Sequence, residues 1–159
     1  MLKLDDNDIC DACTNWEKKS SIDWDLRRKQ LDEIVNKYKK TDGSYDCVIP
    51  VSGGKDSHAQ AIYARDELGL NPLLVTFVPR DLVELGRKNI ENLKSIGFDY
   101  IEFTPNPNIY RKLAKIGLTE FGDVTWPEHH GLFIVPIKIA AAFKIPLVIW
   151  GENPQYEYG

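Results

Sequence analysis

The feature that most constrains this chain is the alternation of short apolar runs with helix-length segments between residues 45 and 150. Four runs have the length and composition of buried strands: 45–51, 72–78, 100–104 and 146–150. Segments with helical spacing lie between them: 56–68, 81–96, 108–116 and 128–143. Pro136 should kink the last helix or mark its start, and residues 117–125 are predicted to be irregular. The pattern predicts an α/β fold, with a parallel sheet carrying helices on both faces.

The N-terminal part of the chain has a different character. Residues 1–43 are predicted to form a short helical appendage that contains Cys10 and Cys13, with a helix over 23–40 capped by Ser21 or Asp23. Residues 44–159 are then the second domain. A chain of 159 residues is long enough for one domain with such an appendage.

Charge and cysteine content exclude several classes of protein. The formal net charge is −4, which argues against a nucleic-acid-binding domain. Three cysteines cannot make a disulfide framework, and the first residues lack the pattern of a signal peptide. The most apolar stretch, 131–150, is interrupted by Lys138, Lys144 and two prolines, so no membrane span is expected. These observations predict a cytoplasmic protein.

The motif S-G-G-K-D-S at 52–57 follows the first predicted strand and opens a helix. Glycines let the backbone approach an anion, and N–H groups at a helix start point toward it. Asp56 would repel a phosphate directly but could hold a bridging Mg²⁺. The alternative is a plain helix start with Asp56 as its cap. The complete motif favours a phosphate site built from the following residues: Ser52, Gly53, Gly54, Lys55, Asp56 and Ser57.

Other polar residues are predicted at the same edge, because ligands bind beyond the carboxyl ends of parallel strands. Gly151, Glu152 and Asn153 follow the fourth predicted strand. Glu152 could bind Mg²⁺ or a reacting amide, and Asn153 could donate to a phosphate. The alternative is an ordinary polar turn.

The motif resembles the signature of the PP-loop (N-type) ATP pyrophosphatases. Within that superfamily the chain is similar to the N-acetyl sugar amidotransferases of surface-polysaccharide (LPS O-antigen) biosynthesis. The segments that carry this resemblance are C-D-A-C (10–13), I-D-W-D-L-R-R-K-Q-L (22–31), D-C-V-I-P-V-S-G-G-K-D-S (46–57), W-P-E-H-H-G (126–131) and W-G-E-N-P-Q-Y-E-Y-G (150–159).

The resemblance implies an adenine nucleotide alpha-hydrolase-like fold and an ATP-dependent reaction. The acetamido group of a nucleotide-linked N-acetyl sugar is adenylated with release of pyrophosphate. Ammonia from a separate glutaminase subunit then replaces AMP and gives an acetamidino sugar. By the same resemblance Lys55, Asp56 and Glu152 are catalytic, with Mg²⁺ at Asp56. Thr76, Phe77 and Gly151 would join the 52–57 residues in binding ATP.

The segment W-P-E-H-H-G has two interpretations. Trp126, Glu128, His129 and His130 could bind the sugar substrate together with Asn153. They could also form a helix N-terminus, with a proline in its first turn and with histidines that are exposed. The negative charge of Glu128 would then interact favourably with the helix dipole. Adjacent histidines point in different directions on a helix, so we do not expect both in one site.

Two departures from the family pattern bear on these expectations. The family carries a second cysteine pair upstream, so Cys10 and Cys13 would be half of a zinc site. Its members are about twice this length, so the chain resembles a segment of such an enzyme or a shortened relative. The alternatives are a tRNA-thiolating PP-loop enzyme and an ATP-binding module without activity of its own.

Overall fold

The computed structural model describes residues 4–78 and 83–151. It divides the chain into two compact units, Met1–Asn36 and Lys37–Gly159, with the boundary inside α2 (Trp24–Tyr38). In the first unit α1 (Asp11–Lys19) precedes α2 and was not expected from the sequence. Asp23 caps α2, since its carboxylate accepts a hydrogen bond from the backbone N–H of Leu26 at 2.9 Å.

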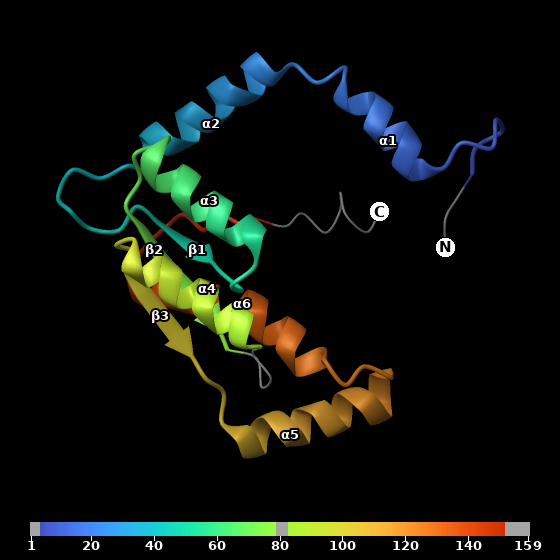
Figure 1. The fold of residues 1–159 in the computed structure, drawn as a ribbon, viewed down its shortest axis with the longest axis vertical. Helices are drawn as coiled ribbons and strands as arrows, with labels where there is room; N and C mark the ends of the chain where they lie inside the picture. The colour runs from blue at the N-terminus through green and yellow to red at the C-terminus, as the bar shows by residue number, and fades with distance from the viewer. Residues whose placement is uncertain (1–3, 79–82, 152–159) are drawn as a thin grey trace. The chain divides into compact units, whose positions relative to one another are not determined.

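The second unit contains the parallel sheet that the alternating pattern predicts. Its strands are β1 (Cys47–Pro50), β2 (Pro72–Phe77) and β3 (Tyr100–Phe103), and they lie in the order β1-β2-β3 (Figure 1). Both strand pairs are parallel, with Cys47 opposite Pro72 and Leu74 opposite Tyr100. The α/β class is therefore confirmed, and the arrangement is Rossmann-like.

The predicted fourth strand is reduced to a single parallel bridge. Val148 pairs with Val48 on the side of β1 that faces away from β2. Two backbone hydrogen bonds of 2.9 Å make this bridge, from Val48 N to the Leu147 carbonyl and from Ile149 N to the Val48 carbonyl. The prediction of a strand over 146–150 was thus right in position and direction but too long.

Four helices cover the sheet or continue from it: α3 (Lys55–Asp66), α4 (Glu84–Ser95), α5 (Pro107–Ile116) and α6 (Trp126–Ala142). The crossovers through α3 and α4 run in one direction along the sheet, so right-handed connections place both helices on one face. The chain then returns past β1, which places α6 on the opposite face (Figure 1).

The structure corrects two expectations about the segment before and within α6, namely that residues 117–125 are irregular and that Pro136 could mark the start of the helix. Residues 117–125 are not wholly irregular, because a π-helical turn, η1, spans Gly117–Phe121 and ends at Gly122 in the left-handed conformation. α6 begins at Trp126 and continues through Pro136. The start is set by Pro127 in the first turn, where a missing N–H costs nothing. Pro136 lacks only one N–H donor, and its buried ring packs within the domain.

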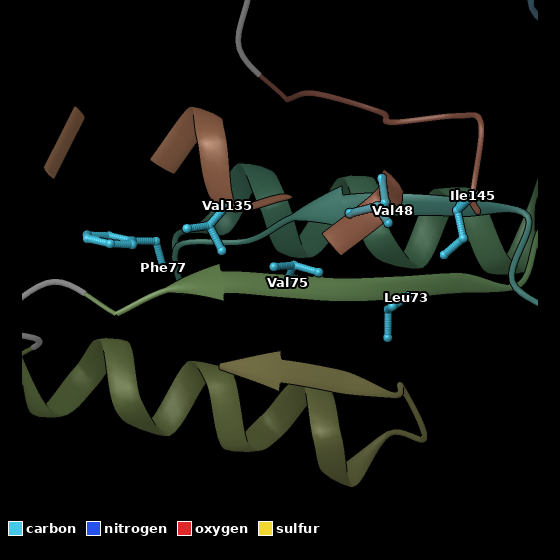
Figure 2. Close-up of a cluster of buried hydrophobic side chains, with 7 residues drawn as sticks. Val48, Leu73, Val75, Phe77, Val135 and Ile145 are labelled. Atoms are coloured by element: carbon cyan, nitrogen blue, oxygen red, sulfur yellow. The ribbon is translucent and has the colours of Figure 1, made fainter. Parts of the chain in front are cut away.

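A hydrophobic cluster joins β1, β2 and α6 (Figure 2). Alternate residues of β2 point toward α6, as expected for a strand buried on both faces. The cluster consists of Val48, Leu73, Val75, Phe77, Val135, Ala140 and Ile145. Burial of these side chains fixes α6 on the face of β1 and β2, with Gly131 in its N-terminal half against the Phe77 ring at the carboxyl end of β2.

Candidate functional site

The chain reverses its crossover direction beside β1, and this defines the place where a ligand is expected. α3 leads from β1 to β2, whereas the 145–149 segment returns to the other side of β1. Connections that leave in opposite directions open a crevice at the carboxyl ends of the strands. The 52–57 loop lies at this position, directly after β1.

The 52–57 loop enters α3 through a turn that only glycine permits. Gly53 has φ +81°, and a Cβ atom there would lie 2.8 Å from the backbone oxygen of Gly86 in α4. Both the left-handed conformation and the close backbone approach exclude a side chain. Gly54 is the extended N-cap residue of α3. At Gly53 and Gly54 the loop therefore presents backbone without side chains just before the helix begins.

Two backbone N–H groups of the loop make only weak internal contacts. The Ser52 nitrogen lies 3.4 Å from Ser57 Oγ, and the Gly54 nitrogen lies 3.4 Å from Ser52 Oγ. Both distances are at the long limit of hydrogen bonding. An anion could accept stronger hydrogen bonds from the same two groups, at the N-terminus of a 12-residue helix. The geometry would therefore allow the loop to bind an anion.

Lys55 and Asp56 pair with each other. Lys55 Nζ lies 2.6 Å from Asp56 Oδ1, and the two side chains are 88% and 77% exposed. Such an exposed pair stabilises a protein by about 0–1 kcal/mol, so it separates at small cost. Lys55 can then contact an anion, and the Asp56 carboxylate can bind a divalent cation.

A cavity of about 660 Å³ lies between the loop, β2 and α6, within the size range of nucleotide and cofactor pockets. Its polar side is formed by loop residues and its apolar side by β2 and α6. The lining residues are Pro50, Val51, Ser52, Gly54, Asp56, Ser57, Val75, Phe77, His129, Leu132, Phe133, Pro136, Trp150 and Gly151.

The cavity brings together residues that are distant in the sequence. Of the predicted site residues, Phe77, His129 and Gly151 line it together with four members of the 52–57 loop. Gly53 and Lys55 belong to the loop but are not among the described lining residues. Glu152 and Asn153 lie outside the described residues.

The apolar wall was not predicted from the sequence. Leu132, Phe133 and Pro136 come from one stripe of α6, and Trp150 packs against Phe133 with ring centroids 5.1 Å apart. A helix that is apolar on most sides does not show which stripe faces a cavity. The position of this stripe depends on how α6 packs on β2.

Thr76 is placed differently from what the sequence analysis predicted. Its side chain is buried on the face of the sheet opposite to Val75 and Phe77, and the described cavity wall does not include it. Its hydroxyl is hydrogen-bonded to the Val51 carbonyl and to the Tyr100 hydroxyl. Burial raises the pKa of Tyr100 to about 12, so that hydroxyl stays neutral. Thr76 thus contacts the backbone just before the loop and is not among the described residues that line the cavity.

A second side chain also ties down the loop, and the sequence analysis missed it. Asn89 of α4 donates a hydrogen bond from Nδ2 to the Gly53 carbonyl at 2.7 Å. One asparagine on an amphipathic helix gives no sequence signal for such a contact. Only the close approach of α4 at Gly86 brings Asn89 within reach.

Most of the W-P-E-H-H-G side chains contact one another or nearby residues of the domain. Trp126 stacks on Phe121, and the ring of His130 lies 4.2 Å from the ring of Trp126. Nδ1 of His130 is also 2.8 Å from the Trp126 carbonyl. Glu128 accepts a 3.3 Å hydrogen bond from the Tyr110 hydroxyl. For Trp126, Glu128 and His130 the structure therefore agrees with the helix N-terminus interpretation.

His129 is the member of this segment that lines the cavity. Its Nδ1 lies 3.7 Å from a carboxylate oxygen of Asp123. Hydrogen bonds from the hydroxyl and N–H of Thr125 lower the pKa of Asp123, so this carboxylate is ionised near neutral pH. His129 can therefore donate or accept a hydrogen bond at the cavity while a negative charge lies near it.

The spacing of Cys10 and Cys13 would suit half of a tetrahedral zinc site. The sulfur atoms of Cys10 and Cys13 are 3.4 Å apart and the thiols are reduced; their hydrogen bond raises the pKa of Cys13. Within residues 4–78 and 83–151, no group of three or more His, Cys, Asp or Glu residues is arranged to hold a metal. Tetrahedral zinc needs two further ligands, so the predicted zinc site is not complete here. Cys47 is buried in β1, and burial raises its pKa to about 12.

No family model matches the chain. An uncharacterized protein of Methanocaldococcus jannaschii is 28% identical over 100 residues, which are 63% of this chain and 35% of that protein. A solved structure, of a predicted tRNA methyltransferase subunit from the same organism, has 24% identity and a TM-score of 0.48, covering 68% of this chain and 53% of that chain. The chain thus spans about a third of the curated relative and half of the solved chain. None of the helices in the described residues has the length and apolar character that a membrane crossing requires.

Proposed function

We propose that this chain is the ATP-binding portion of an ATP-pyrophosphatase-type amidotransferase that acts on a nucleotide-linked N-acetyl sugar. The observation that carries the proposal is the 52–57 loop. It places two weakly bonded N–H groups, a helix N-terminus and the Asp56 carboxylate at one wall of a cavity suited to a nucleotide. The S-G-G-K-D-S motif and the flanking segments supply the reaction class by resemblance.

In the proposed reaction the amide oxygen of the acetamido group attacks the α-phosphorus of ATP. The bond to the bridging oxygen breaks, pyrophosphate leaves, and an imidate adenylate forms. Ammonia then adds to the imidate carbon and AMP leaves, giving the acetamidino group after loss of a proton. The proposed partner for the second step is a glutaminase subunit that supplies ammonia.

The loop residues would stabilise the charge of the pyrophosphate group. The N–H groups of Ser52 and Gly54 would donate to phosphate oxygens, and Lys55 would move from Asp56 to the same oxygens. Asp56 would then hold Mg²⁺, which supplies charge neutralisation at the phosphates when bound. Glu152 stays a proposed catalytic residue by resemblance alone.

The apolar wall would exclude water from the adenylate. Phe77, Phe133 and Trp150 line the cavity opposite the polar loop. An adenylate in such a pocket would be protected from hydrolysis. Attack of ammonia on the imidate carbon could then compete with attack of water on the same carbon. His129 would contact the sugar or accept the proton released from ammonia.

Pyrophosphate release from Mg-ATP tests the proposal directly, in the presence of a nucleotide-linked N-acetyl sugar and an ammonium salt. We expect Asp56→Ala to lower the rate of pyrophosphate release at least about 100-fold. Without this carboxylate, Mg²⁺ would lose a ligand and would no longer neutralise the phosphates of ATP. Asp66→Ala is the matched control: both carboxylates are on α3 and pair with the preceding basic residue. Asp66→Ala should stay within about twofold of the wild type.

Two results would decide against the proposal. Equal turnover by the Asp56→Ala and wild-type proteins would remove the loop from the reaction. Tight Mg-ATP binding by the wild type without pyrophosphate release, with every sugar nucleotide tested, would show a binding module instead of an enzyme.

A further inference from the structure

We propose that Asn89 is a positioning residue of the 52–57 loop, which aims the Gly54 N–H at the anion by holding the Gly53 carbonyl. The inference rests on the proposed function for the identity of that anion, the β and γ phosphates of ATP. It rests on geometry alone for the contact itself, the 2.7 Å hydrogen bond from Asn89 Nδ2 to the Gly53 oxygen.

The direction of a peptide group follows from the contact of its carbonyl. In a trans peptide the C=O of one residue and the N–H of the next point to opposite sides of the chain. Asn89 draws the Gly53 carbonyl toward α4, so the Gly54 N–H points away from α4. Gly54 lines the cavity, and its N–H has only a 3.4 Å contact with Ser52 Oγ. The N–H is therefore presented where a ligand would lie.

Thr76 acts in the same way two peptides earlier. Its hydroxyl holds the Val51 carbonyl from behind the sheet, so the Ser52 N–H points to the opposite side. That N–H also has only a 3.4 Å contact, to Ser57 Oγ. Two alternate peptides of the loop are thus fixed by side chains that do not face the cavity. The anion-facing groups need no reorganisation when a ligand arrives.

Asn89 can hold the loop because α4 is itself held firmly. Ile90 and Leu93 of α4 are fully buried. On the outer side, Glu102 of β3 accepts 2.6 Å hydrogen bonds from both Arg87 and Lys94 of α4. Burial raises the pKa of Glu102, but the two cations outweigh burial and lower it overall, so the pairs stay ionised at neutral pH. The position of α4 is therefore set independently of the loop.

Two variants of Asn89 separate positioning from packing. Asn89→Ala removes the amide, and Asn89→Asp keeps its size but replaces the donor with an oxygen that repels the Gly53 carbonyl. Asn92→Ala is the control, because Asn92 is exposed on the same helix one turn further along. Titration calorimetry with Mg-pyrophosphate, Mg-ATP and AMP measures affinity, and ¹⁵N relaxation of the Ser52 and Gly54 amides measures loop order without ligand.

We expect both Asn89 variants to bind Mg-pyrophosphate and Mg-ATP about 5- to 10-fold more weakly, as for loss of one well-formed hydrogen bond. AMP lacks the phosphates that the loop would hold, so its affinity should change by less than about twofold. The order parameter of the Gly54 amide should fall from about 0.85 toward 0.6 in Asn89→Ala and stay unchanged in Asn92→Ala, whereas that of the Ser52 amide, whose peptide Thr76 holds, should change less.

Different outcomes overturn different claims. Unchanged pyrophosphate affinity in both Asn89 variants, or an equal loss for AMP and ATP, would overturn the positioning role. Unchanged loop order in ligand-free Asn89→Ala would overturn it as well. If the wild type binds neither Mg-ATP nor pyrophosphate, the proposed function and the identity of the anion fail, and the relaxation data alone decide whether Asn89 holds the loop.

Discussion

The 52–57 loop and the first turn of α6 are both helix N-termini with polar residues, yet they contribute to the cavity in different ways. At the loop, side chains of β2 and α4 donate hydrogen bonds to the carbonyls of Val51 and Gly53, and in our proposal the adjoining N–H groups of Ser52 and Gly54 face the cavity that these two residues line. In the first turn of α6, Trp126, Glu128 and His130 contact other residues of the domain, and His129 alone of the four reaches the cavity wall.

The difference shows which kind of site is robust to small changes. A backbone site depends on the conformation of a few peptides, which glycines and anchors fix. A side-chain site on a helix depends on the rotation of that helix, because successive residues point about 100° apart. Substitutions in the loop and in α6 should therefore differ in the size of their effect and in whether they alter stability or ligand binding.

The largest effect is expected for Gly53→Ala. Alanine at φ +81° is strained, and its Cβ would lie 2.8 Å from the Gly86 backbone oxygen. We expect a loss of about 2–3 kcal/mol in the free energy of unfolding, together with loss of measurable Mg-ATP binding. Chemical denaturation and calorimetry measure the two effects.

Gly43→Ala separates the cost of a positive φ from the cost of the steric clash with Gly86. Gly43 has nearly the same φ, +79°, but its Cβ position has no neighbour within 4 Å. Its substitution should cost about 1 kcal/mol and leave nucleotide binding intact. Equal costs at the two positions would mean that the approach of α4 does not constrain the loop.

An intermediate effect is expected for Gly131→Ala in α6. Alanine normally stabilises a helix interior relative to glycine by about 1 kcal/mol. Here its Cβ would lie 2.4 Å from the ring of Phe77, which is buried and stacks near Phe103. We expect a net destabilisation of about 1–2 kcal/mol, measured by thermal or urea unfolding.

A double-mutant cycle checks the cause of that loss. In a Phe77→Leu background the ring is gone, so Gly131→Ala should become neutral or stabilising. If the cost of Gly131→Ala is the same in both backgrounds, the contact between α6 and β2 is not its origin.

The sequence was informative where the chain itself determines the geometry. Strand-length runs and the S-G-G-K-D-S motif predicted the parallel sheet, the strand–loop–helix unit and four of the loop residues that line the cavity. These features are local, and glycine, capping and periodicity act over a few residues.

The missed features all depend on contacts between distant segments. Thr76 was assigned to the nucleotide by resemblance, but strand alternation turns its side chain to the face opposite Val75 and Phe77, where its hydroxyl is hydrogen-bonded to the Val51 carbonyl. Asn89 and the α6 stripe at Leu132 and Phe133 gained their roles only through packing. Pro136 does not mark the start of α6, and the local rule that suggested it takes no account of the burial of its ring within the domain.

The smallest effect is expected from the paired substitutions His129→Ala and His130→Ala, which test helix phase within the first turn of α6. His129 lines the cavity, whereas His130 contacts the ring and the carbonyl of Trp126. We expect His129→Ala to raise the KM for the nucleotide-linked N-acetyl sugar about 3- to 5-fold, as for loss of one hydrogen bond to a ligand. His130→Ala should leave KM within about twofold and lower the free energy of unfolding by about 0.5–1 kcal/mol, through the lost ring contact. Steady-state pyrophosphate release and urea unfolding measure the two quantities. Equal KM values for the two variants would show that the rotation of α6 does not select between the histidines. The difference between the 52–57 loop and α6 would then be supported only by the Gly53→Ala and Gly131→Ala substitutions.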